Sequence, residues 1–390
     1  MSADARPAAA MRFAFVSTLA NTPWGGSEEL WSRTAERLAE AGCPVAASVQ
    51  GRSPPHPRIA ALSSAGVAVA SRPTFFSVWR RLRRRVSGSG VSLAVADFHR
   101  WLDRCRPSLV VLAEGRNLPP VELIEACIER RLAFVTIGQS NAEGWWFHDD
   151  AAARYRAALP KARRCYFVSE ANRRLAEKQV GGPIENAEVV FNPFNVPFTA
   201  APAWPGDDGP LRLACVGRLE PASKGQDLLF EALAAAPWTE RDWRLTVFGE
   251  GPVREGLERL AAQLGLSERV SFAGQVADVE AIWRDHHLLA LPSRHEGLPL
   301  VVVEAMLCAR PVLATDVAGA REVIEDGVTG FLAAAPTVGA LSAALERAWA
   351  RRADLRQMGR DAAEAIRRRT PADPVAIFAQ KLRRLAACPA

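Results

Sequence analysis

The stretch SRHEGLPLVVVEAM, residues 293–306, places two carboxylates eight residues apart, with mostly aliphatic residues between them. Pro299 suits the first turn of a helix that continues through VVVEAML, so Glu296 precedes this helix and Glu304 lies about one and a half turns inside it. The helix rise separates the two carboxylates by roughly 8 to 12 Å. This distance is too long for a retaining pair of glycoside-cleaving carboxylates and fits the wider inverting pair only if the loop folds back.

The neighbours of the two glutamates favour ligand contact over acid and base chemistry. Glu304 interrupts an aliphatic segment that we expect to be buried, where an unpaired carboxylate is costly, so it needs fixed donors such as hydroxyls. Glu296, beside Gly297 and the start of the helix, can offer a ligand both its carboxylate and backbone N–H groups. An ordinary helix-dipole partner would explain Glu296 but not Glu304.

Two cations follow another expected strand, LRLACVG, in the loop from Gly217 to Gly225. Arg218 and Lys224 lie six residues apart in a loop that opens a helix, where they can clamp a phosphate together with free N–H groups. The loop is not a Walker A motif, and two basic residues in a loop are also compatible with plain solvation. After the strand WRLTVFG, the glycines of Gly249-Glu250-Gly251 allow close approach of a ligand to the backbone.

The elements that must position these loops alternate short apolar strands with helices in two series, which predicts parallel sheets. The first series includes MRFAFVS, SLVVLAEG, LAFVTIGQS, RRCYFVSE and AEVVFNPF, and the second includes LRLACVGR, WRLTVFGEG, VSFAGQV, HLLALPS and PVLATDV. Residues 192–210 hold five prolines and two glycines without periodicity, which indicates a linker. We therefore expect an α/β protein of two facing Rossmann-like domains, with the ligand in the interdomain cleft at the carboxyl ends of the strands. The expected boundaries are a disordered tail at 1–10, a first domain at 11–192, a linker at 193–210, a second domain at 211–372 and a C-terminal segment at 373–390.

Composition narrows the class of protein. A chain of 390 residues with 49% hydrophobic content suits about two domains, and no apolar run is long enough to span a membrane. Seven scattered cysteines without a C-x-x-C pair favour a reducing, cytoplasmic setting over disulfides or a zinc site. The net charge of +6 is densest from Arg80 to Arg85, where a peripheral contact with anionic membrane at the inner face and a solvated helix face are equally good interpretations. No motif supports a nucleic-acid partner.

Together, Gly217-Arg218 through Lys224-Gly225 and the Glu296-x7-Glu304 pair resemble the retaining glycosyltransferases of family 4, which have the GT-B fold. The resemblance covers most of the chain and is most specific from 211 to 331. It implies that Arg218 and Lys224 hold the diphosphate of a nucleotide sugar, Glu296 contacts the donor sugar, and Glu304 accepts hydrogen bonds from the ribose. It also implies a donor site completed by Gly217, Gly249, Val276, Gly297 and Leu298, and a C-terminal segment, 373–390, that returns to the first domain.

In the first half, the segment Trp24-Gly25-Gly26-Ser27 resembles the family's glycine loop near the donor phosphates and the acceptor. Ser27 is a suitable helix N-cap there, and a tight strand-to-helix turn is an equally good interpretation. After the strand LAFVTIG, many family members have a histidine where this chain has Gln139-Ser140-Asn141, so we include Gln139 and Asn141 among the acceptor-side candidates.

The resemblance implies transfer of a sugar from a nucleotide diphosphate sugar to a hydroxyl of a glycan, glycolipid or small molecule, with retention and front-face attack. No Asp-x-Asp occurs near the expected site loops, so we expect no metal and no tightly bound cofactor. Two alternatives stay open: a non-catalytic sugar-nucleotide-binding protein, and a GT-B enzyme of another reaction such as a sugar-nucleotide epimerase.

Overall fold

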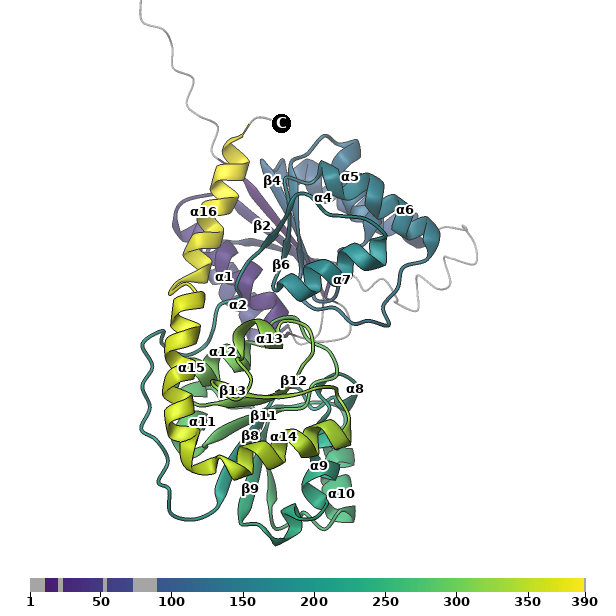
Figure 1. Cartoon of the computed structure of the whole chain (residues 1–390). Helices are drawn as coiled ribbons and strands as arrows, with labels where there is room; N and C mark the ends of the chain where they lie inside the picture. The colour runs from purple at the N-terminus through teal and green to yellow at the C-terminus, as the bar shows by residue number, and fades with distance from the viewer. Residues whose placement is uncertain (1–10, 20–23, 52–54, 73–89, 389–390) are drawn as a thin grey trace, which may run out of the picture. The chain divides into compact units, whose positions relative to one another are not determined.

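The protein is described from a computed structural model that covers residues 11–19, 24–51, 55–72 and 90–388, with the backbone alone for 90–94. The chain folds into two compact units (Figure 1). Unit 1 comprises Met1–Val168, Asn172–Asn192 and Asp373–Ala390, and unit 2 comprises Ser169–Ala171 and Pro193–Ala372. Each unit is an α/β structure built on one parallel sheet.

Unit 1 contains a sheet whose strands, within the described residues, run in the order β3-β2-β1-β4-β5-β6-β7. All neighbouring pairs are parallel, and Ser17 at the end of β1 is in register with Ala113 of β4. The strands are β1 (Phe13–Ser17), β2 (Val45–Gln50), β3 (Ala68–Arg72), β4 (Leu109–Glu114), β5 (Phe134–Gly138), β6 (Arg164–Phe167) and β7 (Ala187–Val189).

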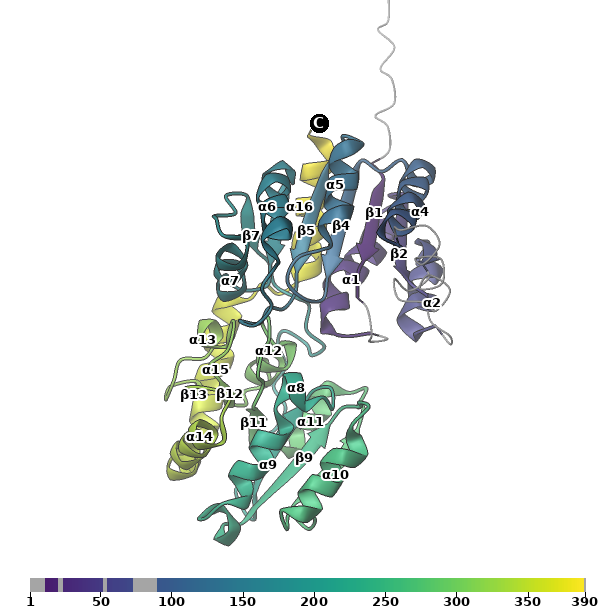
Figure 2. The same ribbon diagram turned by 90° about the vertical axis from the view of Figure 1, so that its right-hand side faces the viewer.

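Helices cover both faces of the unit 1 sheet (Figure 2). One face packs against α1 (Gly26–Glu40), α2 (Pro57–Ser64) and α16 (Pro374–Ala387). The other packs against α4 (Gly90–Cys105), α5 (Val121–Glu129), α6 (Asp149–Ala158), a 3-10 turn (Leu159–Lys161) and α7 (Glu170–Val180). The C-terminal helix α16 therefore belongs to the core of unit 1, where the ring of Phe378 meets Tyr166 edge to face.

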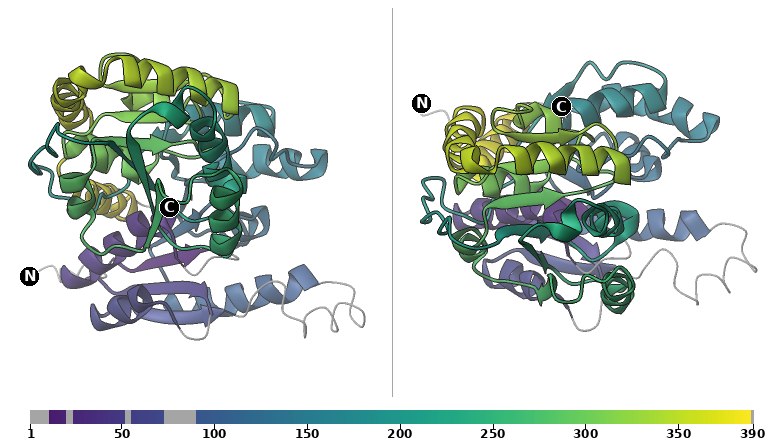
Figure 3. Two further views of the ribbon diagram at one scale, coloured as in Figure 1. Left: turned by 90° about the horizontal axis from the view of Figure 1, so that it is seen from below. Right: turned by 60° about the horizontal axis from the view of Figure 1, so that its bottom comes forward.

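Unit 2 contains a second parallel sheet, in the order β10-β9-β8-β11-β12-β13. Its strands are β8 (Leu211–Val216), β9 (Trp243–Phe248), β10 (Val270–Gly274), β11 (Leu288–Leu291), β12 (Val312–Thr315) and β13 (Gly330–Ala333). Figure 3 shows these green strands flanked by helices. The helices are α8 (Pro221–Lys224), α9 (Gln226–Ala234), α10 (Arg254–Gln263), α11 (Val279–Asp285), α12 (Leu300–Leu307), α13 (Ala320–Val323), α14 (Val338–Ala350) and α15 (Leu355–Arg369), with 3-10 turns at Trp238–Glu240 and Arg352–Asp354.

In each sheet, successive strands are added first toward one edge and then toward the other. The position where this order reverses is the switch point of the sheet. In unit 1 this point lies between β1 and β4, and in unit 2 between β8 and β11. Ligands of doubly wound sheets bind beyond the carboxyl ends of the strands at such points. The loops after these strands are therefore where each unit should hold a ligand.

The α/β class and the two parallel sheets confirm the predicted fold class. Strands β2 and β3 did not emerge from the sequence pattern, because VAASVQ and AVASR are rich in alanine and serine, which have low strand propensity. Residues 193–210 contain no helix or strand. Within the part of the chain that the structure describes, no helix is both long and apolar enough to span a membrane.

Candidate functional site

The loop after β8 is held against the end of β11 by a glycine that cannot be replaced without displacement. Gly225 has a φ of 64°, and a Cβ built on it would lie 2.1 Å from the carbonyl oxygen of Pro292. Because only glycine combines this backbone conformation with so close a contact, the end of α8 and the segment after β11 are fixed side by side. This contact places Lys224 beside the loop that contains Glu296.

Lys224 and Glu296 form an ion pair at the switch point of unit 2. The Nζ atom of Lys224 lies 2.5 Å from Oε1 of Glu296, and Ser293 donates its hydroxyl to the same oxygen at 2.7 Å. Glu296 is 8% exposed. The structure thus brings together two of the three predicted catalytic residues, and their pairing fixes an ammonium group where the ligand of such a sheet is expected.

A second ion pair ties the same two loops together. Arg294 donates to both carboxylate oxygens of Asp227, at 2.7 and 2.8 Å, and to the carbonyl oxygen of Pro221 at 2.6 Å. Burial alone would raise the pKa of Asp227, but the hydrogen bonds from Arg294 hold it below its ordinary value. The bidentate geometry holds the segment after β11, which contains Glu296, against the region of Lys224.

The glycines at the ends of β8 and β9 let two strand ends approach closely. Gly249 has a φ of 123°, and a Cβ on it would lie 2.1 Å from the carbonyl oxygen of Gly217. Arg218 follows this contact, and its guanidinium pairs with Glu220 at 3.1 Å on the half-exposed rim of the loop. The structure therefore places Arg218 in the same loop as Lys224 but pairs it with a different carboxylate.

Glu304 lies inside α12 and is 4% exposed. Its Oε1 accepts hydrogen bonds from the backbone N and from the side-chain Nδ2 of Asn195, both at 2.9 Å. The expectation that this buried carboxylate needs fixed donors is confirmed, although the donors are amide groups and not hydroxyls. Helix α12 begins at Leu300, directly after Pro299, so the predicted start of this helix is correct within one residue.

The remaining predicted donor-side residues are in nearby segments of unit 2. Gly297 accepts a hydrogen bond from the N–H of Gly319 at 2.9 Å, and Leu298 is buried. Val276 lies in the loop after β10 and is half-buried. No contact among the described residues assigns any of these three a role in binding, so their roles stay predictions.

The predicted acceptor-side residues of unit 1 are engaged in its own structure. Gln139 and Asn192 exchange hydrogen bonds at 3.1 and 2.7 Å, and Asn141 donates to Gln179 at 2.9 Å. Gln139 and Asn141 are both buried. They stabilise the loop after β5, where the family resemblance had suggested a histidine.

The glycine loop before α1 differs in detail from the prediction. Gly25 is the N-cap residue and Gly26 begins the helix, so Ser27 lies in the first turn and is not the N-cap. The backbone of Gly25 is extended, with a φ of −163°, a conformation that most residues can adopt. The contribution of this segment lies in the side chains that follow it.

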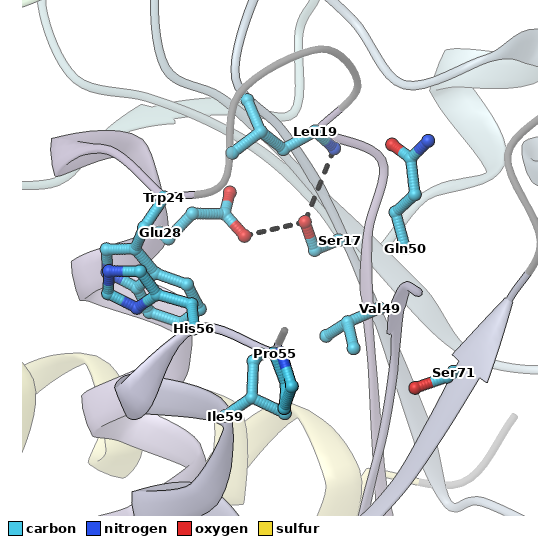
Figure 4. A pocket seen from close by; sticks show the side chains of 10 residues that line it. All are labelled: Ser17, Leu19, Trp24, Glu28, Val49, Gln50, Pro55, His56, Ile59 and Ser71. Atoms are coloured by element: carbon cyan, nitrogen blue, oxygen red, sulfur yellow. Dashed lines mark hydrogen bonds between the residues drawn. The ribbon is translucent and has the colours of Figure 1, made fainter. Parts of the chain in front are cut away.

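Sequence reasoning missed Glu28, a buried carboxyl of unit 1 whose pKa is shifted. Glu28 is 3% exposed, and its Oε2 accepts a hydrogen bond from the hydroxyl of Ser17 at 2.6 Å. Burial raises the pKa of its carboxyl to about 7, although the hydrogen bond from Ser17 opposes the shift. Figure 4 shows the two groups facing each other in a pocket at the carboxyl end of the sheet.

A second carboxylate, which is partly buried, lies at the switch point of unit 1. Glu114 ends β4, and its carboxylate accepts hydrogen bonds from the hydroxyl of Thr18 at 2.5 Å and the N–H of Arg116 at 3.0 Å. Burial raises the pKa of Glu114 despite these donors. A glutamate in the first turn of a helix and another at a strand end are ordinary sequence features, so nothing in the linear pattern signalled that burial raises the pKa of both.

The basic segment Arg80 to Arg85 lies outside the described residues, so its contact with a membrane stays a prediction.

Among the residues that are described, no three histidine, cysteine, aspartate or glutamate side chains gather in a way that could hold a metal ion.

Comparison with known proteins finds a family match within unit 2. The family model described as Glycosyl transferases group 1 matches residues 210–351, which include β8 to β13 together with Lys224, Glu296 and Glu304. The chain contains a glycosyl transferases group 1 domain. The predicted family resemblance is therefore confirmed for this domain, which forms most of unit 2.

Relatives of this domain are named glycosyltransferases. The chain is 38% identical over 128 residues to the alpha-D-kanosaminyltransferase of Streptomyces kanamyceticus. This match covers 32% of this chain and 33% of that protein. The chain is also 38% identical over 159 residues to the D-inositol 3-phosphate glycosyltransferase of Gordonia bronchialis, covering 38% of this chain and 34% of that protein. The matches thus span about a third of the length of these relatives.

Solved structures match over nearly the whole chain. HepE of Anabaena, solved in complex with UDP, has a TM-score of 0.72 at 20% sequence identity, and the match covers 96% of this chain and 100% of that one. At this identity the likeness establishes the fold. Two Rossmann-like units in this arrangement along the chain constitute the GT-B fold, as predicted.

Proposed function

We propose that the protein is a retaining, metal-independent glycosyltransferase, which moves a sugar from a nucleotide diphosphate sugar to an acceptor hydroxyl. The observation that carries the proposal is the Lys224–Glu296 pair, 2.5 Å apart at the switch point of a glycosyl transferases group 1 domain. Two relatives of this domain have names that describe sugar transfer, and HepE, which shares the fold, was solved with UDP. The role fits glycan, glycolipid or small-molecule glycoside synthesis.

In this proposal the loop after β8 holds the leaving group. Sugar transfer develops negative charge on the diphosphate as the glycosidic bond breaks. Lys224 is held in place by Glu296 and by the close contact of Gly225, so its ammonium needs little reorganisation to stabilise that charge. Arg218, half exposed on the same loop, can leave Glu220 and form a bidentate contact with a phosphate.

Glu296 and Glu304 serve the two ends of the donor. Glu296 accepts from Ser293 and Lys224 through Oε1, so its carboxylate is fixed in orientation to accept hydroxyl hydrogens of the donor sugar. Glu304 is assigned to the ribose hydroxyls, with Asn195 holding its Oε1 in place. Neither carboxylate then acts as a base, because front-face attack lets a donor phosphate oxygen receive the acceptor's proton.

The state of the cysteines supports a cytoplasmic location. All seven cysteines of the sequence lie within the described residues, and each is a free thiol. Free thiols are typical of reducing compartments, where nucleotide sugars would be available.

Two measurements test the proposal. A thermal-shift screen with UDP, GDP and ADP sugars should raise the Tm of the chain with one donor class, because a ligand that binds only the folded state stabilises it. Incubation with that donor and a hydroxyl acceptor should then give a product whose anomeric configuration, read by NMR, equals that of the donor. Binding without transfer to any acceptor would identify a non-catalytic binder, isomerised nucleotide sugar would identify an epimerase, and an inverted product would exclude retention.

A further inference from the structure

Arginines line the edge of the unit 1 sheet where its strands begin. Because neighbouring strands are parallel (Figure 2), the residues that precede them lie along one edge, opposite to the loops at the carboxyl ends. Arg12 directly precedes β1, Arg106 lies in the turn before β4, Arg131 lies in the turn before β5, and Arg164 begins β6. These four strands are consecutive in the sheet, so the four arginines form a row, which we call the basic edge.

The side chains of the basic edge are open to a partner. Arg12, Arg106, Arg131 and Arg164 are all exposed. Within the part of the chain that the structure describes, no carboxylate pairs with Arg12, Arg106 or Arg131, and Arg164 lies 3.6 Å from Glu188. The row therefore presents positive charge that the surrounding residues of unit 1 do not neutralise.

Two of these arginines adopt a backbone conformation that favours glycine. The φ angle is 43° at Arg106 and 53° at Arg131. In the described part of unit 1, the other residues with a positive φ are Gly42, Gly66 and Gly181, in the turns before β2, β3 and β7. A side chain at positive φ costs stability. Two exposed arginines in such turns therefore point to a role for their side chains beyond the fold of unit 1.

The corresponding edge of unit 2 carries the opposite charge. Glu268 lies in the turn before β10, Asp242 directly precedes β9, Asp208 lies in the segment before β8, and Asp285 lies in the turn before β11. All four side chains are exposed, and the strand order β10-β9-β8-β11 places them in a row, which we call the acidic edge. Asp242 lies 3.6 Å from Arg244, and no lysine or arginine among the described residues pairs with the other three.

Charges of the opposite sign beside each edge have local partners. Next to the basic edge, Asp103 accepts a hydrogen bond from Arg130 at 2.9 Å. Next to the acidic edge, Arg284 donates to Asp278 at 2.8 Å. The two rows of exposed charge therefore keep their signs.

The two edges match in spacing as well as in sign. Each row follows four consecutive strands, and neighbouring strands lie about 4.8 Å apart, so each row extends over roughly 15 Å. A single exposed ion pair contributes little, but a row of aligned pairs gives both affinity and a defined register. Because the two edges belong to different units, one copy of the chain can offer its basic edge to the acidic edge of another.

We propose that the chain self-associates, with the basic edge of unit 1 in one copy docked on the acidic edge of unit 2 in another. A second copy is the occupant that the structure favours, since the same chain carries an oppositely charged row of the same length. The inference goes beyond the proposed function and does not depend on it, because neither edge includes Lys224, Glu296 or Glu304.

Sedimentation velocity of the full chain at increasing protein concentration measures the association directly. We expect the average mass to rise with concentration at about 0.1 M salt, where the Debye length is about 10 Å, and to stay at that of the monomer at about 1 M salt, where it is about 3 Å. Association of equal strength at both salt concentrations would show that these charges do not hold the copies together, and would overturn the proposal.

Glycine at the two strained positions separates the charge from the folding of unit 1. Arg106→Gly combined with Arg131→Gly removes two cations and suits a positive φ, so we expect a Tm close to that of wild type or higher. The Kd of self-association should rise by about tenfold or more. The control, Arg174→Gln combined with Arg368→Gln, removes two exposed arginines from α7 and α15 and should associate like wild type. Equal Kd values for the two double variants would overturn the proposal.

A charge exchange identifies the partner of each edge. Arg106→Glu combined with Arg131→Glu should abolish association, and so should Asp208→Lys combined with Asp242→Lys in a second preparation. An equimolar mixture of the two preparations should associate again, because one chain then has two acidic edges and the other has two basic edges. A mixture that stays monomeric would contradict the pairing of the two edges.

An anionic membrane is another surface that a row of arginines could bind. Cosedimentation of the full chain with phosphatidylglycerol vesicles distinguishes this occupant from a second copy. A chain that stays monomeric at every concentration would overturn the proposal. Vesicle binding that is lost in the variant with Arg106→Gly and Arg131→Gly would then make a lipid surface the occupant of the basic edge.

Discussion

Two carboxylates of unit 2, Glu296 and Glu304, and two of unit 1, Glu28 and Glu114, lie in different environments. In unit 2, Glu296 is paired with an ammonium group at 2.5 Å and Glu304 accepts two hydrogen bonds from Asn195. In unit 1, Glu28 and Glu114 receive hydroxyl and backbone donors, and burial raises the pKa of both. The difference indicates that unit 2 holds a carboxylate against a fixed cation that can meet an anion, whereas unit 1 presents carboxyl groups whose raised pKa favours the protonated form, which can donate as well as accept a hydrogen bond.

The largest effect should follow removal of the fixed cation in unit 2. Lys224→Ala takes away the ammonium that we propose to stabilise the leaving diphosphate and leaves Glu296 without its ion-pair partner. We expect kcat/KM for sugar transfer to fall by about a hundredfold or more, the scale found for a preorganised donor. Lys161→Ala, at an exposed position of unit 1, is the matched control and should stay close to wild type. Transfer by Lys224→Ala at the control's rate would remove Lys224 from the site.

The pH dependence of stability should sharpen the contrast in unit 1. The folded pKa of Glu28 is raised to about 7 from an ordinary value of 4.5, so its contribution to stability is complete below pH 4.5 and is lost as the pH rises through 7. With about 1.4 kcal/mol for each pKa unit, the loss at alkaline pH is on the order of 3 kcal/mol. Glu28→Gln should flatten the fall in Tm between about pH 4.5 and pH 7, the interval between the ordinary and the raised pKa.

The control for this measurement is Glu40→Gln, which should keep the pH dependence of wild type because Glu40 is exposed on the same helix. Equal slopes of Tm against pH in wild type and Glu28→Gln would show that Glu28 ionises as it does in the unfolded chain. The distinction between the carboxylates of the two units would then be wrong for this residue.

Two glycines of unit 2 offer a matched test of the close strand contact. Gly249→Ala forces a Cβ to within 2.1 Å of the Gly217 carbonyl at a φ of 123°, so we expect a loss of about 1–3 kcal/mol in stability and weaker nucleotide binding. Gly256→Ala, inside α10 with no atom within 4 Å of the new Cβ, should be neutral or stabilising by up to about 1 kcal/mol. Equal Tm values for the two variants would mean that the ends of β8 and β9 can move apart without a loss of stability.

The smallest effect concerns the charge of Glu304. Glu304→Gln keeps an oxygen for Asn195 but loses the stronger hydrogen bonds that a carboxylate accepts, so we expect KM for the nucleotide sugar to rise about tenfold. Glu255→Gln, on the surface of α10, serves as the control. An unchanged KM, with Tm also unchanged, would show that the charge of Glu304 does not contribute to binding of the nucleotide sugar. Its role would then be to hold Asn195 within residues 193–210.

Much of unit 2 could be predicted because its site is encoded locally. Pro299 marks the start of α12, and the positions of Glu296 and Glu304 relative to this helix follow from that residue alone. The loop from Gly217 to Gly225 also follows a clear strand and precedes a clear helix. What could not be predicted is which carboxylate each cation meets, since the pairing of Lys224 with Glu296 depends on the approach of Gly225 to Pro292.

Unit 1 was harder to predict because its pocket comes from elements with weak sequence signals. Two residues that line this pocket, Gln50 and Ser71, lie on β2 and β3. These two strands were not predicted, because their alanine and serine content gives a weak strand signal. Glu28 follows the glycine loop like any acidic residue in a first helical turn, and its burial arises only when α1 packs on the end of β1, beside Ser17. Such contacts depend on tertiary structure and leave no periodic trace in the sequence.

The most direct test of the central claim is calorimetric titration of the full chain with UDP, GDP and ADP, which are nucleoside diphosphates without a sugar. We predict that at least one of them binds, that Lys224→Ala weakens its Kd by about tenfold or more, and that Lys161→Ala leaves its Kd unchanged. Equal affinity of wild type and Lys224→Ala for every nucleoside diphosphate, or binding of none, would contradict the assignment of the Lys224–Glu296 pair to a diphosphate site.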